Sequence, residues 1–163
     1  PRSTLFPYTT LFRSVQPIPL FEHNLTSRER VLGPDHPDTL TSRNNLAGAY
    51  ESAGRLSQAI DLFEQTLSDR LRVLGPDHPG TLASRNNLAL AYESAGRLDE
   101  AIGLYEQNLA DCERFLNSDH PYIEAFRDNL ADAYRAVGRD EDAEALLDPP
   151  PASDDAGADR PDD

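Results

Sequence analysis

The residues of this sequence that could do chemistry are an aspartate and a histidine that stand side by side three times. The heptapeptide VLGPDHP occupies 31–37 and again 73–79, and Asp-His-Pro recurs at 119–121. An acid beside a histidine can serve as a general acid and base, or ligate a metal ion. Either chemistry requires that the surrounding elements bring the right partners to the histidine.

A repeat of 42 residues sets the spacing of these histidines. Aligning Val31–Arg72 with Val73–Arg114 gives 31 identities in 42 positions, and a looser third copy follows. Apolar residues recur at spacings of three and four on both sides of Gly54, which predicts two amphipathic helices. Gly54 suits the left-handed position after the first helix, and Gly75-Pro76 breaks the chain before the next copy. Each repeat is therefore predicted to be an antiparallel helix pair.

The repeat resembles the tetratricopeptide repeat family. The resemblance rests on Leu46-Ala47-x-x-Tyr50, Gly54-Arg55 and Ala59-x-x-x-Phe63, with counterparts in the next two copies. The period of 42 and the strings LGPDHP and NNLA resemble the kinesin light chain type of repeat. Where that family has tryptophan or leucine, this sequence has Arg43, Arg85 and Arg127. The resemblance implies an all-α fold, a right-handed solenoid of stacked antiparallel helix pairs with about 3.5 repeats.

The chain is predicted to divide into three parts. Residues 1–15 form an artefactual or disordered leader, since PRSTLFPYTTLFRS at 1–14 resembles a translated sequencing adapter. Residues 16–147 form the helical repeat domain, with a half repeat at 16–32 and repeats at about 33–74, 75–116 and 117–147. Residues 148–163 form an acidic, proline-rich tail that is expected to be disordered. Because the chain contains no methionine and starts at Pro1, we expect it to be a fragment or a processed product.

Stacking argues against chemistry at the repeated histidines. Helices in contact lie roughly 8–10 Å apart, whereas a zinc ligand lies about 2.1 Å from its ion, so His36, His78 and His120 cannot share one. The Asp-His pair also lacks a third orienting group and a nucleophile, since no serine or cysteine falls into register with it. Pro37 instead suits the first position of a helix, and His36 is expected to pack or hydrogen-bond in the joint. The sequence therefore predicts no enzyme, no cofactor and no metal.

The acidic composition restricts the partners. The chain has 29 acidic residues and 15 basic ones, all arginine, for a formal net charge of −14. Such a surface repels a phosphate backbone, so nucleic acid is excluded, and no apolar run is long enough to cross a membrane. The single cysteine, Cys112, fits a reducing compartment, and we expect a cytoplasmic protein. The oligomeric state is left open.

The first helix of each repeat carries a polar face opposite its apolar one. In the resembled family this side lines a concave groove that holds extended peptides, with asparagines bound to the ligand backbone. The key groove asparagines that the resemblance implies are Asn45, Asn87 and Asn129, with Asn44 and Asn86 as near neighbours. Leu90 lies on the same predicted face, and Arg43, Arg85 and Arg127 join the groove if they reach it. The alternative is that the asparagines tie one repeat to the next.

The predicted function is a non-catalytic scaffold that binds an extended peptide or partner segment in this groove. The positions before the key asparagines are Asn44, Asn86 and Asp128, none of them basic, so a neutral or basic peptide is favoured over an acidic one. The alternative function is a C-terminal sensor or self-association arm of a larger signalling protein, a nucleotide-driven switch whose N-terminal part is missing. Both alternatives imply a protein partner.

Overall fold

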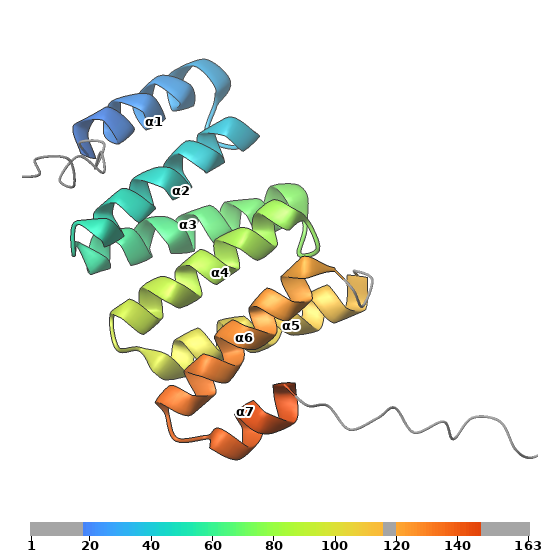
Figure 1. Cartoon of the computed structure of the whole chain (residues 1–163). Helices are drawn as coiled ribbons and strands as arrows, with labels where there is room; N and C mark the ends of the chain where they lie inside the picture. Colours follow the sequence, from blue (N-terminus) through green and yellow to red (C-terminus); the bar gives the residue numbers. More distant parts are fainter. Residues whose placement is uncertain (1–17, 116–119, 148–163) are drawn as a thin grey trace, which may run out of the picture.

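The structure, a computed structural model, describes residues 18–115 and 120–147, and each element within those ranges is a helix (Figure 1). The helices are α1 (Ile18–Leu32), α2 (Pro37–Ser52), α3 (Leu56–Leu74), α4 (Pro79–Ser94), α5 (Leu98–Phe115), α6 (Pro121–Ala136) and α7 (Asp140–Leu147). Each helix packs against the helix before it and the helix after it in the chain. The predicted all-α solenoid of helix pairs is confirmed.

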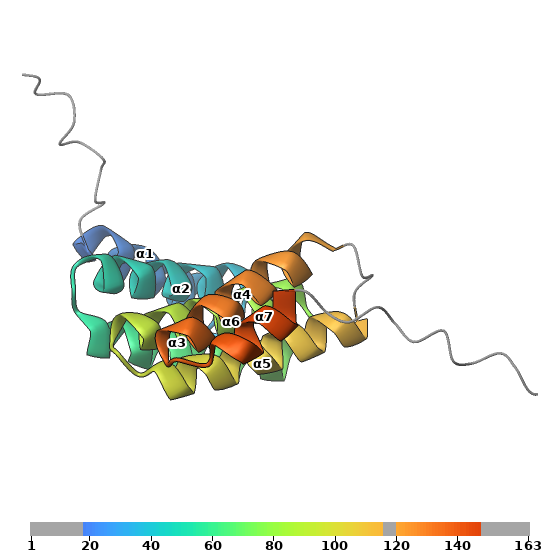
Figure 2. The same ribbon diagram turned by 60° about the horizontal axis from the view of Figure 1, so that its bottom comes forward.

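The helices form two layers. The first helices of successive repeats, α2, α4 and α6, lie side by side in one layer, and α3 and α5 lie behind them (Figures 1 and 2). The connections after α1 and α3 therefore lie at one edge of the molecule, where α5 also ends and α6 begins, and the turns within repeats lie at the opposite edge. The leader predicted at 1–15 and the tail predicted at 148–163 lie outside the described residues.

Histidines cap helices at one edge, and glycines form the turns at the other. His36, His78 and His120 each precede a proline and cap the helix that follows, with Nδ1 accepting a hydrogen bond from the backbone N–H two residues on, at 3.2, 3.0 and 3.2 Å. The expected hydrogen bond in the joint is thereby confirmed, and it is a helix cap. At the other edge Gly54, Gly96 and Gly138 have φ of 72°, 73° and 77°, the left-handed conformation that glycine adopts at no steric cost.

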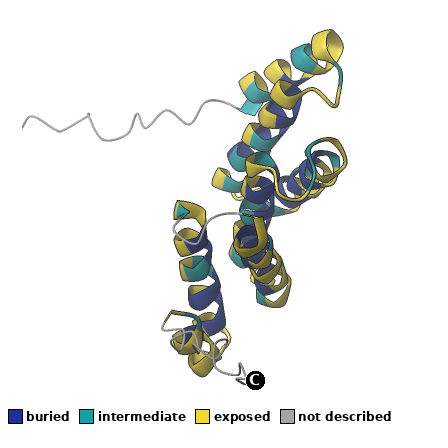
Figure 3. Ribbon diagram, turned by 90° about the vertical axis from the view of Figure 1, so that its right-hand side faces the viewer, coloured by how far each residue is buried: buried dark blue, intermediate teal, exposed yellow. Residues whose placement is uncertain are grey.

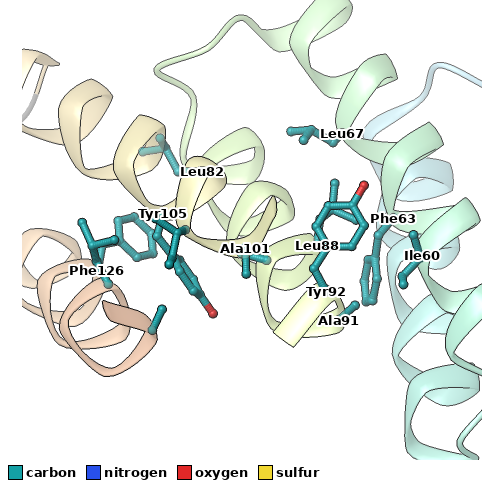
Figure 4. Packing of buried hydrophobic residues seen from close by; sticks show 14 of the residues in the cluster. Ile60, Phe63, Leu67, Leu82, Leu88, Ala91, Tyr92, Ala101, Tyr105 and Phe126 are labelled. Atoms are coloured by element: carbon teal, nitrogen blue, oxygen red, sulfur yellow. The ribbon is translucent and has the colours of Figure 1, made fainter. Parts of the chain in front are cut away.

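One apolar core runs through all the repeats. Ala47 and Ala59 are fully buried, and their small side chains let α2 and α3 approach closely. Figure 4 shows Phe63 of α3 beside Leu88 and Tyr92 of α4, in the interface between two repeats. Since each helix pair buries its apolar face against its neighbours, stability depends on the whole stack. No helix within the described ranges is both long enough and apolar enough to span a bilayer.

Candidate protein-interaction face

A tyrosine in each repeat holds the first helix against the second helix of the preceding repeat. Its hydroxyl donates to a glutamate 28 residues earlier, in the pairs Tyr50 to Glu22 (2.7 Å), Tyr92 to Glu64 (2.6 Å) and Tyr134 to Glu106 (2.8 Å). Burial and the hydrogen bond to Glu64 raise the pKa of Tyr92 to about 12, so the hydroxyl stays protonated at neutral pH. Sequence reasoning missed these glutamates, although their constant spacing from the tyrosines was a usable signal.

An arginine covers the ring of each of these tyrosines. The guanidinium of Arg55 lies 4.3 Å from the centre of the Tyr50 ring, and Arg97 and Arg139 lie 4.1 Å from the rings of their tyrosines. The turn after α2 places Arg55 there, because its N–H donates back to the carbonyl of Tyr50 at 2.9 Å. The Gly-Arg pair in each repeat is thus explained by a turn and a cation–π contact.

Two of the arginines that stand where the family has tryptophan or leucine are packed between helices. Arg43 has a side chain that is 8% exposed, and it donates to Asp69 at 2.5 Å and to Glu29 at 3.2 Å. Arg85, at 1%, donates to Asp111 at 2.8 Å and to Asn108 at 3.1 Å. The condition that these two arginines reach the groove is therefore not met, because carboxylates between the helices hold them.

Arg127 differs from the two buried arginines in exposure. Its side chain is 35% exposed and donates to Glu113 of α5 at 2.7 Å. It is thus paired with an acid of the preceding helix, as Arg43 is with Glu29. All three arginines act first as links between consecutive helices.

The asparagines form a ladder across the first helices. Asn87 of α4 donates from Nδ2 to Oδ1 of Asn44 on α2 at 3.2 Å, and Asn129 of α6 donates to Asn86 of α4 at 2.9 Å. Each bond spans 43 residues, so the asparagines do tie one repeat to the next. Asn45, at the N-terminal end of this row, is exposed and makes no side-chain hydrogen bond with any described residue.

The ladder bonds leave part of each amide free. An asparagine side chain offers two N–H donors and a carbonyl oxygen with two lone pairs, and a ladder bond uses one donor and one lone pair. Four ladder asparagines are half-buried rather than buried, and Asn45 is exposed, so the remaining groups are accessible. The same residues can hold the repeats together and bind a ligand.

The surface around the ladder, which we call the ladder face, combines the ladder asparagines with one apolar side chain and an excess of acid. Leu90 of α4 is 39% exposed, and Gly48, in register on α2, leaves open space beside its backbone. The charged side chains that follow the ladder along the three helices are Glu51, Glu93, Asp128, Asp132 and Arg135. Arg135 is already paired with Asp132 at 2.9 Å, so the ladder face is acidic.

The arrangement offers binding groups and no reactive centre. Among residues 18–115 and 120–147, no group of three or more His, Cys, Asp or Glu side chains is placed to hold a metal ion. Cys112 is fully buried, and burial raises the pKa of its thiol to about 11, which leaves it protonated at neutral pH. A protonated, buried thiol is a poor nucleophile.

Comparison with known proteins agrees with this reading of the geometry. Two tetratricopeptide repeat family models match the chain, over residues 18–71 and 81–122. A stretch of 37 residues is 54% identical to Protein KINESIN LIGHT CHAIN-RELATED 2 of Arabidopsis thaliana, which is 23% of this chain and 6% of that protein. The chain thus spans only a small part of this relative.

Solved structures that are similar over 80% of this chain include two of different origin. One is a Podosopora anserina putative kinesin light chain with nearly identical TPR-like repeats, with a TM-score of 0.74 at 36% identity over 62% of that chain. The other is BtubC (BKLC) from P. vanneervenii, with a TM-score of 0.73 at 22% identity over 52% of that chain, a likeness of fold alone. The chain spans less than two thirds of either protein.

The chain is therefore a tetratricopeptide repeat protein. Its period of 42 residues and the relatives above make its repeats similar to those of kinesin light chains. Repeats of this class are non-catalytic scaffolds for protein interaction, so the predictions of a scaffold and of no enzymatic activity are confirmed.

Proposed function

We propose that the ladder face binds an extended segment of a partner protein. The observation that carries this proposal is the ladder itself, which presents partly free amides at a regular spacing across three helices. A peptide backbone alternates N–H and C=O groups, and an amide can pair with both. Recognition through the backbone needs little from the ligand sequence, so side-chain preference must come from the rest of the ladder face.

The charge of the ladder face favours a neutral or basic segment. Four carboxylates border the ladder, against one arginine that is already paired. The burial of Arg43 and Arg85 removes the two cations that could have received an acidic ligand. Complementary charge mainly raises the association rate and excludes wrong partners, so binding is expected to weaken as salt rises.

Asn45 permits a test that separates binding from folding, because it lies in the ladder row but makes no ladder bond. Asn45→Ala is expected to leave the melting temperature unchanged and to weaken peptide binding by several-fold, about 1 kcal/mol for one hydrogen bond. The measurement is fluorescence anisotropy with labelled pools of acidic, neutral and basic peptides. Gln65→Ala, which removes an exposed amide from α3, is the matched control and is expected to bind as the unaltered chain does.

Two outcomes contradict the proposal. If only the acidic pool binds, the charge argument is wrong. If Asn45→Ala and Gln65→Ala bind every pool with the same affinity, the segment does not lie on the ladder.

A further inference from the structure

The edge that carries the joints between repeats is unusually apolar. Ten large hydrophobic side chains of the described residues are exposed, and six of them lie at the ends of helices on this edge: Val31, Leu32, Leu71, Val73, Phe115 and Tyr122. Figure 3 looks onto this edge, which we call the joint edge, and shows the connections at 33–36 and 75–78 largely as exposed chain. Exposed apolar side chains that gather in one region mark an interaction surface.

The joint edge repeats with the period of the fold. Val31, Val73 and Phe115 are spaced by 42 residues and close α1, α3 and α5, with exposed fractions of 67%, 39% and 44%. A partner that covers all three must offer apolar groups at the spacing of the repeat. A second copy of this chain has that spacing by construction.

At Leu71 the joint edge has an apolar side chain where the other two repeats have a glutamate that pairs with a buried or half-buried arginine. In register with it, Glu29 and Glu113 accept hydrogen bonds from Arg43 and Arg127. Leu71 offers no such acceptor to Arg85, which is 1% exposed and whose Nε and Nη2 have no partner among the described residues.

The loss at Leu71 has a physical consequence for stability. Unpaired donors on a buried cation destabilise the fold, and the leucine that causes this is itself 38% exposed. A residue that weakens the fold and stays exposed points to a role outside folding.

Arginines recur on the joint edge among its acids. Arg30, Arg72 and Arg114 recur in register beside the apolar row, and the joints contribute Asp35 and Asp77. Arg72 and Asp35 already form a double hydrogen bond, at 3.0 and 2.5 Å, which links the start of one repeat to the end of its second helix. Two such edges can place arginines opposite carboxylates, which lessens the repulsion expected from the net charge of −14.

We propose that the joint edge is a self-association surface, through which two copies of this chain pair edge to edge about a two-fold axis. A two-fold interface sets the same patch against itself with the order of the repeats reversed. Val73, in the middle of the row, then lies near the axis and meets Val73 of the second copy, while Val31 meets Phe115. This pairing is separate from the ladder face, so one surface can function if the other fails.

Leu71→Glu tests the pairing with a change that is expected to help folding. The glutamate introduces a charge into the interface and supplies Arg85 with the acceptor that its counterparts have. Sedimentation velocity of the full chain at about 100 μM is expected to show dimers for the unaltered chain. For Leu71→Glu the dissociation constant of the dimer is expected to rise by about tenfold or more. The melting temperature of dilute Leu71→Glu is expected to rise.

Leu90→Glu is the matched control, because Leu90 is a leucine of similar exposure, 39% against 38%, on the ladder face. It is expected to leave the dimer intact and to alter peptide binding. The proposal is overturned if the unaltered chain is monomeric at this concentration, or if the two variants change the dimer equally. Weaker peptide binding in Asn45→Ala with the dimer unchanged keeps the two proposals distinguishable.

Cysteine cross-linking tests the position of the axis. A disulfide needs Cα atoms within about 7 Å, so Val73→Cys is expected to form a covalent dimer on mild oxidation while Val31→Cys is not. The native Cys112 is buried and serves as the internal background. Equal cross-linking of the two variants, or none at Val73→Cys, contradicts the two-fold arrangement.

Discussion

The interface between α3 and α4 and the interface between α5 and α6 have the same helix arrangement, but corresponding positions are polar in the first and apolar in the second. In the first, the buried Arg70 donates to the carbonyl of Gly80 at 2.6 Å and to the hydroxyl of Ser84 at 2.8 Å. In the second, Cys112 and Phe126 stand at the positions of Arg70 and Ser84, and both belong to the apolar core. A polar interface and an apolar one thus support the same repeat.

The difference teaches that this fold depends on matched sets rather than on single contacts. Replacing a hydrogen-bonded pair by two apolar groups can leave stability nearly unchanged, whereas removing one partner leaves the other buried and unsatisfied. The contacts that do not vary between the two joints are the histidine caps, the buried alanines and the tyrosine-glutamate pairs. We infer that these contacts determine the geometry and expect the residues between them to be exchangeable in pairs.

The largest expected effect comes from changing only one member of the polar pair. Arg70→Cys leaves the Ser84 hydroxyl and the Gly80 carbonyl without their partner and leaves a cavity where the side chain lay. Loss of about 2–4 kcal/mol from the free energy of unfolding is expected, measured by urea denaturation followed by circular dichroism. Arg70→Cys combined with Ser84→Phe copies the α5/α6 joint, and the double variant is expected to regain most of that loss.

The same cycle shows how the comparison could break. If the double variant is no more stable than Arg70→Cys alone, the apolar solution depends on other residues of the third repeat. Tyr122, which replaces Gly80 and packs beside Phe126 at 5.7 Å between ring centres, would then be the first candidate.

A smaller effect is expected at a contact that does not vary. Tyr92→Phe removes the hydroxyl that donates to Glu64 and is expected to reduce the free energy of unfolding by about 1 kcal/mol. The pKa of Tyr92 is raised from 10.0 to about 12 in the folded chain. Its contribution is therefore fully present below pH 10 and lost as the pH rises through 12. Urea midpoints across this alkaline range should converge for the two proteins, and a constant difference would contradict the assignment.

Local pattern was sufficient to predict the helix pairs, the glycine turns and the role of the joint histidines. Gly54 forms a turn and His36 caps a helix through residues close to them in the sequence, so the local sequence is enough to predict these features. The positions of Arg43 and Arg85 could not be obtained in this way. Arginine is seldom fully buried, and only the paired acids from adjacent helices make it possible here.

The candidate site was predicted in part for a similar reason. Periodicity identified the face of the first helices that carries the asparagines, but not which amide meets which. The offset of 43 residues in the ladder differs by one from the repeat, because Asn87 meets Asn44 and not Asn45. That shift depends on how α4 packs against α2, and the spacing of residues along the chain does not reveal this packing.

The smallest expected effect concerns a buried hydroxyl that the third repeat does without. Thr39 and Thr81 are fully buried and their hydroxyls have no partner among the described residues, whereas the third copy has Ile123 at this position. Thr81→Val keeps the shape and removes the unpaired hydroxyl, so a gain of about 1 kcal/mol in the free energy of unfolding is expected. Thr66→Val is the control, because the equally buried Thr66 hydroxyl donates to the carbonyl of Leu62 at 2.7 Å. Urea denaturation should show a higher free energy of unfolding for Thr81→Val and a lower one for Thr66→Val. Equal changes in the two variants would mean that the unpaired hydroxyl of Thr81 does not destabilise the fold, and that an apolar residue at this position has no advantage over the polar one.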